Sequence, residues 1–364
     1  MSVLKKFHTF MSEVDAALIE RYEEIRMLCI GLVAREHVLL VGPPGTAKSM
    51  VLDVGARWAG AAKFDWLMSK FTTPEDLFGP ISVKGLKDDR YVRITRGKAA
   101  EADFVFIDEV FRSSSAALNL LLKLMNERTY DAGDGPKKTP LRIMVGAANR
   151  WPGEDAQELG ALFDRFLLRR TVKPVSTLAG QERLLFGGPI EVTLSETVTA
   201  KELDQATYEA SGLKFSADGR EAMWEIIRGL AREGIVPGDR RRVKAVKVAQ
   251  AAAWLAGAAA IEPDHLEVLA DCLWDDPTEQ PAKCAQVIAK IANPVGMLVN
   301  GCLVEAEAIV ASCNPRELDQ AMTAVAKLEE IEERLKGKSE PRAETARKHV
   351  VKLCRDLRAK AMSY

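Results

Sequence analysis

Eight residues near the N-terminus constrain this chain more than any other feature. The octapeptide Gly42-Pro-Pro-Gly-Thr-Ala-Lys-Ser49 follows a branched apolar run, His37-Val-Leu-Leu-Val41, and precedes a segment with helical spacing over 49–59. A strand, a glycine-rich turn and a helix in this order bring backbone N–H groups and the positive end of a helix dipole to one point. Such a point attracts phosphate groups.

The loop divides into a wrapping part and a charged end. We expect Lys48 to reach the β- and γ-phosphates of a nucleotide, and the Ser49 hydroxyl to ligate Mg²⁺. The strict pattern has glycine at the sixth position, where this chain has Ala47. We interpret that position as the start of the helix, where alanine is favourable. The residues expected to wrap the phosphates are Gly42, Pro43, Pro44, Gly45, Thr46 and Ala47. Alone, many such octapeptides are ordinary Gly/Pro turns before a helix.

An acidic pair sixty residues after Lys48 changes that balance. Four apolar residues, 104–107, lead directly into Asp108 and Glu109. The carboxyl ends of parallel strands meet at one edge of a sheet, so both carboxylates are expected beside the loop. Asp108 would hold Mg²⁺ through water, and Glu109 would polarise the attacking water. An acidic pair alone is more often a solvated strand end, but the two motifs together predict binding and hydrolysis of ATP–Mg²⁺.

Two polar residues follow at spacings that suit the same chemistry. Asn149 ends the expected strand over 141–148, where an amide would orient the lytic water; a turn asparagine is the alternative. Arg165 lies in the apolar run 162–166, which suits an arginine finger directed at a neighbour's nucleotide. A salt bridge with Asp164 is the alternative for this arginine.

A run of arginines opens a helix in the second half of the chain. The segment Gly238-Asp-Arg-Arg-Arg242 offers arginines of which one would fold back over the γ-phosphate. For Arg241 and Arg242, a solvated run of charge is the stronger alternative.

Strand-like and helical segments alternate as far as Pro174, after which strand signals nearly vanish. This alternation favours an α/β domain with a parallel sheet, followed by two all-helical units. The expected boundaries are 1–185 for the α/β domain, 186–278 for the first helical unit and 279–364 for the second, which has three helices.

Several local expectations accompany this outline. Helical spacing runs through 13–35, and two short β-rich stretches at 81–84 and 91–95 predict a hairpin inserted near 72–97. In the last unit, apolar stripes predict that the final two helices close on each other as an antiparallel hairpin. The helices expected there lie near 281–312, 315–336 and 340–361.

Composition limits the remaining classes of function. The net charge is −1, which makes nucleic acid an improbable general partner. The N-terminus lacks the apolar core of a signal peptide, and the longest apolar run, 251–261, is too short to span a bilayer. Six cysteines without a C-x-x-C pair favour buried thiols over zinc. We therefore expect a cytoplasmic protein without membrane insertion.

Taken in this order, the motifs resemble those of the MoxR family of AAA+ ATPases. The loop GPPGTAKS, with alanine in place of the third glycine, is typical of a MoxR branch. The chain is most similar to the RavA branch, over roughly residues 15–276. The stretches that carry this similarity are 64–80, 126–128, 161–169 and 272–276.

The resemblance implies an αβα P-loop core, an all-helical lid and a hexameric ring. It identifies Asn149 as sensor 1, Arg165 as the finger acting in the neighbouring subunit and Arg240 as sensor 2. Gly238 stands where the family's sensor-2 motif usually begins with serine. The insert near 72–97 matches the helix-2 insert of the clade, and 131–140 falls where a pre-sensor-1 hairpin is expected.

Three functions follow from these features. The first is a chaperone-like remodeller of a protein client that works with a von Willebrand factor A partner, as MoxR proteins commonly do. RavA's inserted β-rich domain has no room here, so its decarboxylase partner is not transferable. The second is a nucleic-acid motor, which the near-neutral charge disfavours. The third is a small-molecule kinase, which leaves Asn149 and Arg165 without roles.

Overall fold

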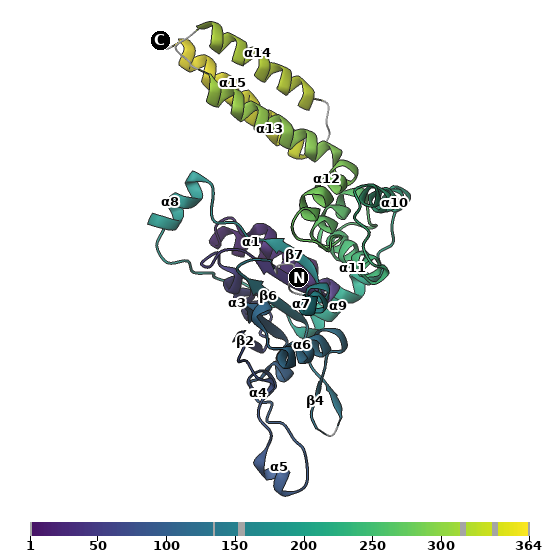
Figure 1. Ribbon diagram of the computed structural model, residues 1–364. Helices are drawn as coiled ribbons and strands as arrows, with labels where there is room; N and C mark the ends of the chain where they lie inside the picture. The colour runs from purple at the N-terminus through teal and green to yellow at the C-terminus, as the bar shows by residue number, and fades with distance from the viewer. Residues whose placement is uncertain (1, 134, 152–156, 314–317, 337–340, 363–364) are drawn as a thin grey trace.

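The computed structural model describes residues 2–133, 135–151, 157–313, 318–336 and 341–362. An α/β unit, a helical unit beside it and a projecting group of C-terminal helices follow one another along the chain (Figure 1). One hydrophobic core runs through the first two units, and a second, separate core holds the C-terminal helices together.

A parallel sheet forms the centre of the first unit, as the sequence predicts. Its order is β2-β3-β6-β1-β7, and every neighbouring pair is parallel. The strands are β1 (His37–Val41), β2 (Lys63–Leu67), β3 (Phe104–Asp108), β6 (Ile143–Ala148) and β7 (Phe166–Thr171). The sequence did not lead us to expect β2 and β7. Every residue of β1 and β6 is buried, which accounts for their continuous apolar sequences.

Helices flank the sheet, and three of them, α3 (Lys48–Trp58), α6 (Ser115–Glu127) and α7 (Gln157–Arg165), connect its strands. Helices α1 (Val3–Ala17) and α2 (Tyr22–Ala34) precede β1, and α8 (Leu178–Phe186) follows β7 and projects from the unit (Figure 1). The helical pattern predicted over 13–35 is divided between α1 and α2. The break follows the extended C-cap Leu18 and contains Glu20, whose φ of 56° is left-handed and whose carboxylate accepts hydrogen bonds from the backbone N–H groups of Ser176 and Thr177.

The insert between β2 and β3 is less regular than the predicted hairpin. A single bridge pairs Ile81 with Arg93, and the second half of the expected first strand, Val83 and Lys84, belongs to α5 (Val83–Lys87). The Ser82 hydroxyl accepts a hydrogen bond from the N–H of Gly85, and this cap starts a helix in place of the strand. A second short helix, α4 (Pro74–Phe78), precedes it.

The hairpin expected within 131–140 is present and touches the insert. It consists of β4 (Thr129–Asp131) and β5 (Pro136–Lys138), paired antiparallel. At its turn, Gly133 has a φ of 99°, and a Cβ there would lie 2.0 Å from the carbonyl oxygen of Tyr91. Only glycine fits at this contact.

The second unit is helical, and it extends one helix further than we expected. It comprises α9 (Ala200–Ser211), α10 (Ala217–Arg232), α11 (Asp239–Leu255), the 3₁₀ helix η3 (Pro263–Asp271) and α12 (Gln280–Ala292). Cys284, Ile288 and Ala292 of α12 join the core that this unit shares with the sheet. The helix predicted over 281–312 is wrong, because Pro294 starts a new helix and Asn293 caps it.

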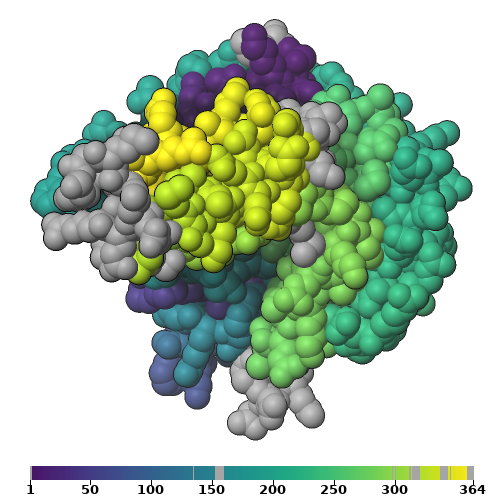
Figure 2. Space-filling model, turned by 90° about the horizontal axis from the view of Figure 1, so that it is seen from above, coloured from purple at the N-terminus to yellow at the C-terminus, as the bar shows by residue number. Residues whose placement is uncertain are grey.

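The C-terminal unit consists of α13 (Pro294–Ser312), α14 (Leu318–Leu335) and α15 (Pro341–Met362). Leu328, Ile331 and Leu335 of α14 pack with Val350 and Leu357 of α15, which confirms the predicted hairpin. Seen from above, this unit lies over the rest of the molecule with its outer face toward the viewer (Figure 2). The cap expected at Asn314 and Pro315 and the break at Gly337 and Ser339 lie outside the described residues.

Within the described residues, no single helix has the length and apolar character to cross a membrane. The bent pair formed by 280–292 and 294–310 passes that test by length and composition, with an angle of 110° between its helices.

His37 predicts an acid sensitivity of the sheet. Its ring lies buried between β6 and α6, where Nδ1 accepts from the N–H of Met144 (3.0 Å) and Nε2 faces the carbonyl oxygen of Met125 (3.1 Å). Burial, with a smaller effect from Arg128, lowers the pKa of His37 to about 3. His37 therefore binds a proton near pH 6.5 in the unfolded chain but stays neutral in the folded chain. Its contribution to the free energy of unfolding falls as the pH drops below 6.5.

Between pH 6.5 and 5, this difference amounts to about 2 kcal/mol of unfolding free energy. Thermal denaturation of the wild type and of His37→Gln at both pH values measures it. The variant should lack this contribution, because glutamine has no proton to gain, so between the two pH values its stability should fall by about 2 kcal/mol less than that of the wild type. Glu20 does not interfere, since hydrogen bonds from residues 176 and 177 lower its pKa to about 2 and its effect begins below pH 4.5. Equal pH dependence in both proteins would exclude His37 as the cause.

Candidate active site

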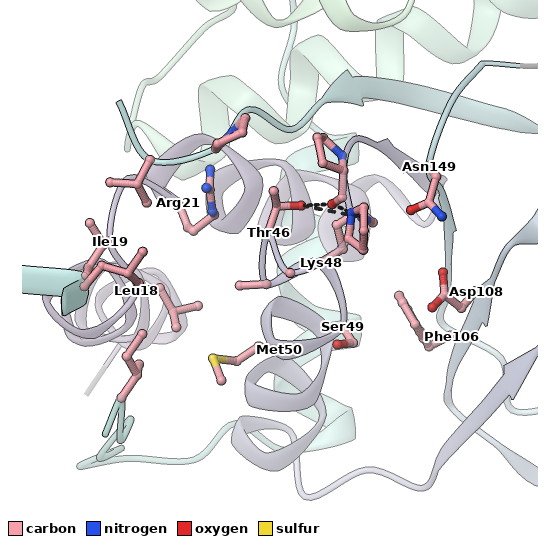
Figure 3. Close-up of a pocket in the computed structure, with 18 of the residues that line it drawn as sticks. Leu18, Ile19, Arg21, Thr46, Lys48, Ser49, Met50, Phe106, Asp108 and Asn149 are labelled. Atoms are coloured by element: carbon pink, nitrogen blue, oxygen red, sulfur yellow. Dashed lines mark hydrogen bonds between the residues drawn. The ribbon is translucent and has the colours of Figure 1, made fainter. Parts of the chain in front are cut away.

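The carboxyl ends of three neighbouring strands form a cavity of about 650 Å³ (Figure 3). The loop after β1, the acidic pair after β3 and Asn149 after β6 all line it. Strand β6 lies between β1 and β3 in the sheet, so Asn149 stands between the loop and the acids. The topology thus brings together the residues that the sequence predicted for ATP and Mg²⁺.

Lys48 is held at the centre of the loop. Its Nζ donates to the carbonyl oxygens of Gly42 and Pro43, both at 2.8 Å. Figure 3 shows Lys48 beside Thr46 in the loop. Burial lowers the pKa of Lys48, and the charges of Asp108 and Glu109 oppose that shift. The loop carbonyls stand where phosphate oxygens would satisfy the same ammonium group, so the residues present fit a nucleotide phosphate.

Gly42 has a packing role that we did not expect. A Cβ at this position would lie 2.2 Å from the carbonyl oxygen of Val172, in the segment after β7. The glycine therefore allows β1 and the chain beside β7 to approach each other. At Gly45, by contrast, φ is 78° and a Cβ would meet nothing within 4 Å, so its conformation explains the glycine.

We interpreted Ala47 as the first residue of the helix, and the structure shows that this is wrong. It is the N-cap of α3, with a φ of 62° in the left-handed region, which explains why the strict pattern has glycine there. For Ala47→Gly, relief of roughly 1 kcal/mol of strain is offset by roughly 0.5–1 kcal/mol of added chain entropy. We expect unchanged ATPase activity and a melting temperature within a few degrees of the wild type. A collapse of activity would show that the methyl group of Ala47 has a function.

The acidic side of the cavity carries the two expected metal ligands. Ser49 lies at the start of α3, Asp108 ends β3, and both line the cavity (Figure 3). A hydroxyl and a carboxylate are the oxygen ligands that Mg²⁺ prefers beside phosphate and water. The donor set therefore fits this ion.

Glu109, like Ala47, is a strained residue of the site. Its φ of 49° is left-handed, which is costly for a residue with a side chain. Its Oε1 accepts a hydrogen bond from the side-chain amide of Asn149, and Oε2 lies 3.5 Å from Nε of Arg112. Glu109 and its predicted partner Asn149 are thus already in contact.

The opposite end of the cavity was not apparent from the sequence. It is largely apolar, and its side chains come from the α1–α2 turn, from α3 and from the segment after β7. Arg21 closes it: its guanidinium is buried and donates to the carbonyl oxygens of Glu20 (2.8 Å) and Lys173 (2.7 Å). This end suits the base of a nucleotide. Its lining residues are Leu18, Ile19, Arg21, Met50, Pro174, Val175, Leu184 and Ile190.

Arg165 and Arg240 do not line this cavity. Nη1 of Arg165 lies 3.4 Å from Oδ2 of Asp164 and 3.3 Å from the carbonyl oxygen of Ala161. Arg240 donates to the side-chain oxygen of Asn126, at the end of α6. The residues found to line the cavity include none from the helical unit over 200–292. Arg240 therefore does not fold over the cavity of its own chain in this arrangement.

Arg241 is not part of a solvated run of charge, which corrects that interpretation. It is 3% exposed and pairs with two carboxylates, whereas Arg242 next to it is partly exposed and lies 3.6 Å from Asp239.

Two family models match the chain. The model described as the MoxR domain in the MoxR-vWA-beta-propeller ternary systems matches residues 5–208, more than half of the chain. A model of the AAA lid domain matches residues 220–288, from α10 into α12. We therefore call the unit formed by α9 to α12 the lid, and the second match agrees with the packing of α12 in it.

Individual relatives agree with these models. An uncharacterized protein of Methanocaldococcus jannaschii is 36% identical over 275 residues, which are 75% of this chain and 71% of that protein. The protein MoxR of Methylorubrum extorquens is 26% identical over 320 residues, 79% of this chain and 92% of its own. The crystal structure of a candidate ATPase from Cytophaga hutchinsonii shares the fold, with a TM-score of 0.64 at 19% identity over 80% of this chain and 95% of that one. The chain belongs to the MoxR family of AAA+ ATPases.

Proposed function

We propose that this protein hydrolyses ATP in a hexameric ring and uses the energy to remodel or activate a protein client together with a von Willebrand factor A partner. The observation that carries the proposal is the cavity that joins Lys48, Asp108, Glu109 and Asn149. The alternative of a small-molecule kinase gives no role to the contact between Glu109 and Asn149, which suits activation of water.

The residues of the cavity divide the work of hydrolysis. The ammonium group of Lys48 binds the β- and γ-phosphates. To do so, it gives up its hydrogen bonds to the carbonyl oxygens of the loop. Ser49 and Asp108 would hold Mg²⁺, which would neutralise charge on the phosphates. Glu109 accepts a proton from the attacking water, and Asn149 holds both the carboxylate and the water in line.

Hydrolysis also needs a second cation at the γ-phosphate. Among the described lining residues the cations are Lys48 and Arg21, and Arg21 lies at the opposite end of the cavity. Arg165 lies outside the cavity and is 21% exposed in its side chain, so a neighbouring subunit is where it would act. The exposed side chains of helix α8 favour contact with a neighbouring subunit beside the cavity. Leu184 and Ile190 line the cavity, while Leu185 and Phe186 beside them are 72% and 81% exposed. Large exposed apolar groups of this kind mark contact surfaces.

The insert and the C-terminal unit are the parts that we assign to partners. The insert exposes apolar Val83, Leu86 and Ile94 beside Lys84 and Lys87, a mixture that suits a polypeptide better than a nucleic-acid backbone. The matching family description names von Willebrand factor A proteins, which supports a partner of that class. Within the family, we infer a RavA-like branch from the stretches 64–80 and 272–276, and a cytoplasmic location.

Removal of residues 294–364 tests the assignment of the C-terminal unit. A cut at 315, which the sequence alone would favour, would strip α13 of the helices that cover Val299, Cys302 and Ala306. The cut at 294 removes that core as a whole and leaves the core of the lid intact. We expect ring formation and basal ATPase activity within about two-fold of the wild type, and a loss of partner binding of tenfold or more, roughly the effect of removing 1.4 kcal/mol.

Three measurements test these expectations. Sizing reports ring formation, and ATPase rates are measured with and without DNA, RNA or candidate proteins. Pull-down from the native host with the tagged full chain reports partner binding. The matched control is a chain that carries a flexible linker after residue 364 in place of the deletion. A truncated protein that is monomeric would show that the unit is needed for assembly. Stimulation by DNA or RNA alone would favour a nucleic-acid motor.

A further inference from the structure

Arg241 joins the lid to the helix that carries Arg165. Its Nη2 donates to Oδ1 of Asp164 at 2.8 Å, its Nη1 donates to the carbonyl oxygen of Cys272 at 3.0 Å, and its Nε lies 3.0 Å from Oδ1 of Asp275. A buried guanidinium persists only when its donors are paired in this way. Arg241 belongs to α11 in the lid, whereas Asp164 belongs to α7 in the α/β unit.

Asp164 divides its charge between two arginines. One carboxylate oxygen accepts from Arg241, and the other lies 3.4 Å from Nη1 of Arg165. Four residues therefore form a row of alternating charge, in the order Arg165, Asp164, Arg241 and Asp275. The contact with Arg165 is at the long end of the hydrogen-bond range, so it holds this side chain weakly.

A second arginine fixes the same junction. Arg169 is fully buried and donates to the carbonyl oxygens of Phe166 (2.8 Å), Phe163 (3.0 Å) and Trp274. Its guanidinium lies 3.8 Å above the ring of Phe163. Burial, and to a smaller extent Arg241, lowers the pKa of Arg169 to about 9, which leaves it charged at neutral pH. The end of α7 is thus attached to the lid at two points, close to Arg165.

We propose that Arg241 is a positioning residue for ATP hydrolysis: it occupies Asp164 and so leaves Arg165 available to the γ-phosphate bound by the neighbouring subunit. This inference rests on the proposed role of Arg165. Without Arg241, Asp164 keeps Arg165 as its cationic partner among the described residues, and a stronger pair within one chain holds the finger back. The lid of each subunit then controls the arginine that this subunit presents to the next.

Arg241→Gln tests the proposal through turnover and through a second change that reverses it. We expect turnover to fall on the order of 10–100-fold, the effect of misplacing a catalytic group. ATP affinity should stay within about two-fold, because Arg241 does not line the cavity. Adding Asp164→Asn should restore much of the rate, since the neutral amide no longer retains Arg165. Arg242→Gln, whose partner Asp239 is fully open to solvent, is the matched control and should behave as the wild type.

A residue that only stabilises the lid would give a different pattern. Under the proposal, Arg165→Ala and Arg241→Gln in one chain are no slower than Arg165→Ala alone. Losses that multiply in the double variant, or a failure of Asp164→Asn to restore the rate, would overturn it. If Arg241→Gln does not assemble, Arg241→Lys takes its place in the test. If Arg241→Lys lowers turnover and adding Asp164→Asn does not restore it, the proposal is overturned as well. Normal turnover in Arg165→Ala alone would instead refute the proposed role of Arg165 as an arginine finger. This result distinguishes a failure of the proposed function from a failure of the inference about Arg241.

Discussion

Glu109→Gln will give a protein that binds ATP and stalls. Glutamine keeps a side-chain oxygen for the amide of Asn149, so the cavity keeps its shape, but it cannot accept the proton of the attacking water. Loss of a general base costs on the order of 10²–10⁴ in rate. Steady-state ATPase assays measure the loss, and equilibrium binding of a fluorescent ATP analogue should show affinity within a few-fold of the wild type.

The matched control is Glu127→Gln, at the far end of α6, where the carboxylate accepts from the hydroxyl of Thr129. Its turnover should equal that of the wild type. Lys48→Ala provides the opposite comparison, because the phosphates lose the ammonium group and binding itself should fail. Normal turnover in Glu109→Gln would show that another group activates the water.

The catalytic side of the cavity could be predicted from the sequence because each part consists of consecutive residues at the end of one strand. The octapeptide after β1, the pair Asp108-Glu109 after β3 and Asn149 after β6 needed only the rule that parallel strands end at one edge. The rest of the chain obeys less local rules. Leu18, Met50 and Val175 form the other end of the cavity from three separate segments, and no spacing connects them.

Single conformations and pairings also escaped prediction. The left-handed φ of Ala47 depends on how the loop enters α3, and a residue type alone does not reveal it. Arg241 and Arg242 are identical neighbours in the sequence, yet one is buried because the helix turns it toward Asp164 and Asp275. The second half of the strand expected at 81–84 forms the start of a helix that one serine caps, while Ile81 still pairs with Arg93. In each case, a contact from elsewhere in the fold or a local hydrogen bond outweighed the average preference of the residues.

Arg165→Ala will abolish most hydrolysis without weakening ATP binding. An arginine that neutralises charge on the γ-phosphate in the transition state contributes on the order of 10³–10⁵ in rate. Within its own chain, Arg165 contacts Asp164 and Ala161 and does not line the cavity, so we propose that the ATP it serves belongs to another subunit. Single-turnover ATPase assays on assembled rings separate this loss from any change in binding.

Mixed rings then decide where Arg165 acts. Lys48→Ala subunits keep Arg165 but cannot hold ATP, and Arg165→Ala subunits hold ATP but lack the arginine. In rings mixed from equal amounts, about one quarter of the interfaces join an intact cavity to an intact Arg165. Activity should therefore return to roughly that fraction of the wild-type rate, although each variant alone is inactive. A ring built with both changes in every subunit is the control and should remain inactive. If mixing is proven by labelled subunits and no activity returns, Arg165 acts within its own chain or only supports α7.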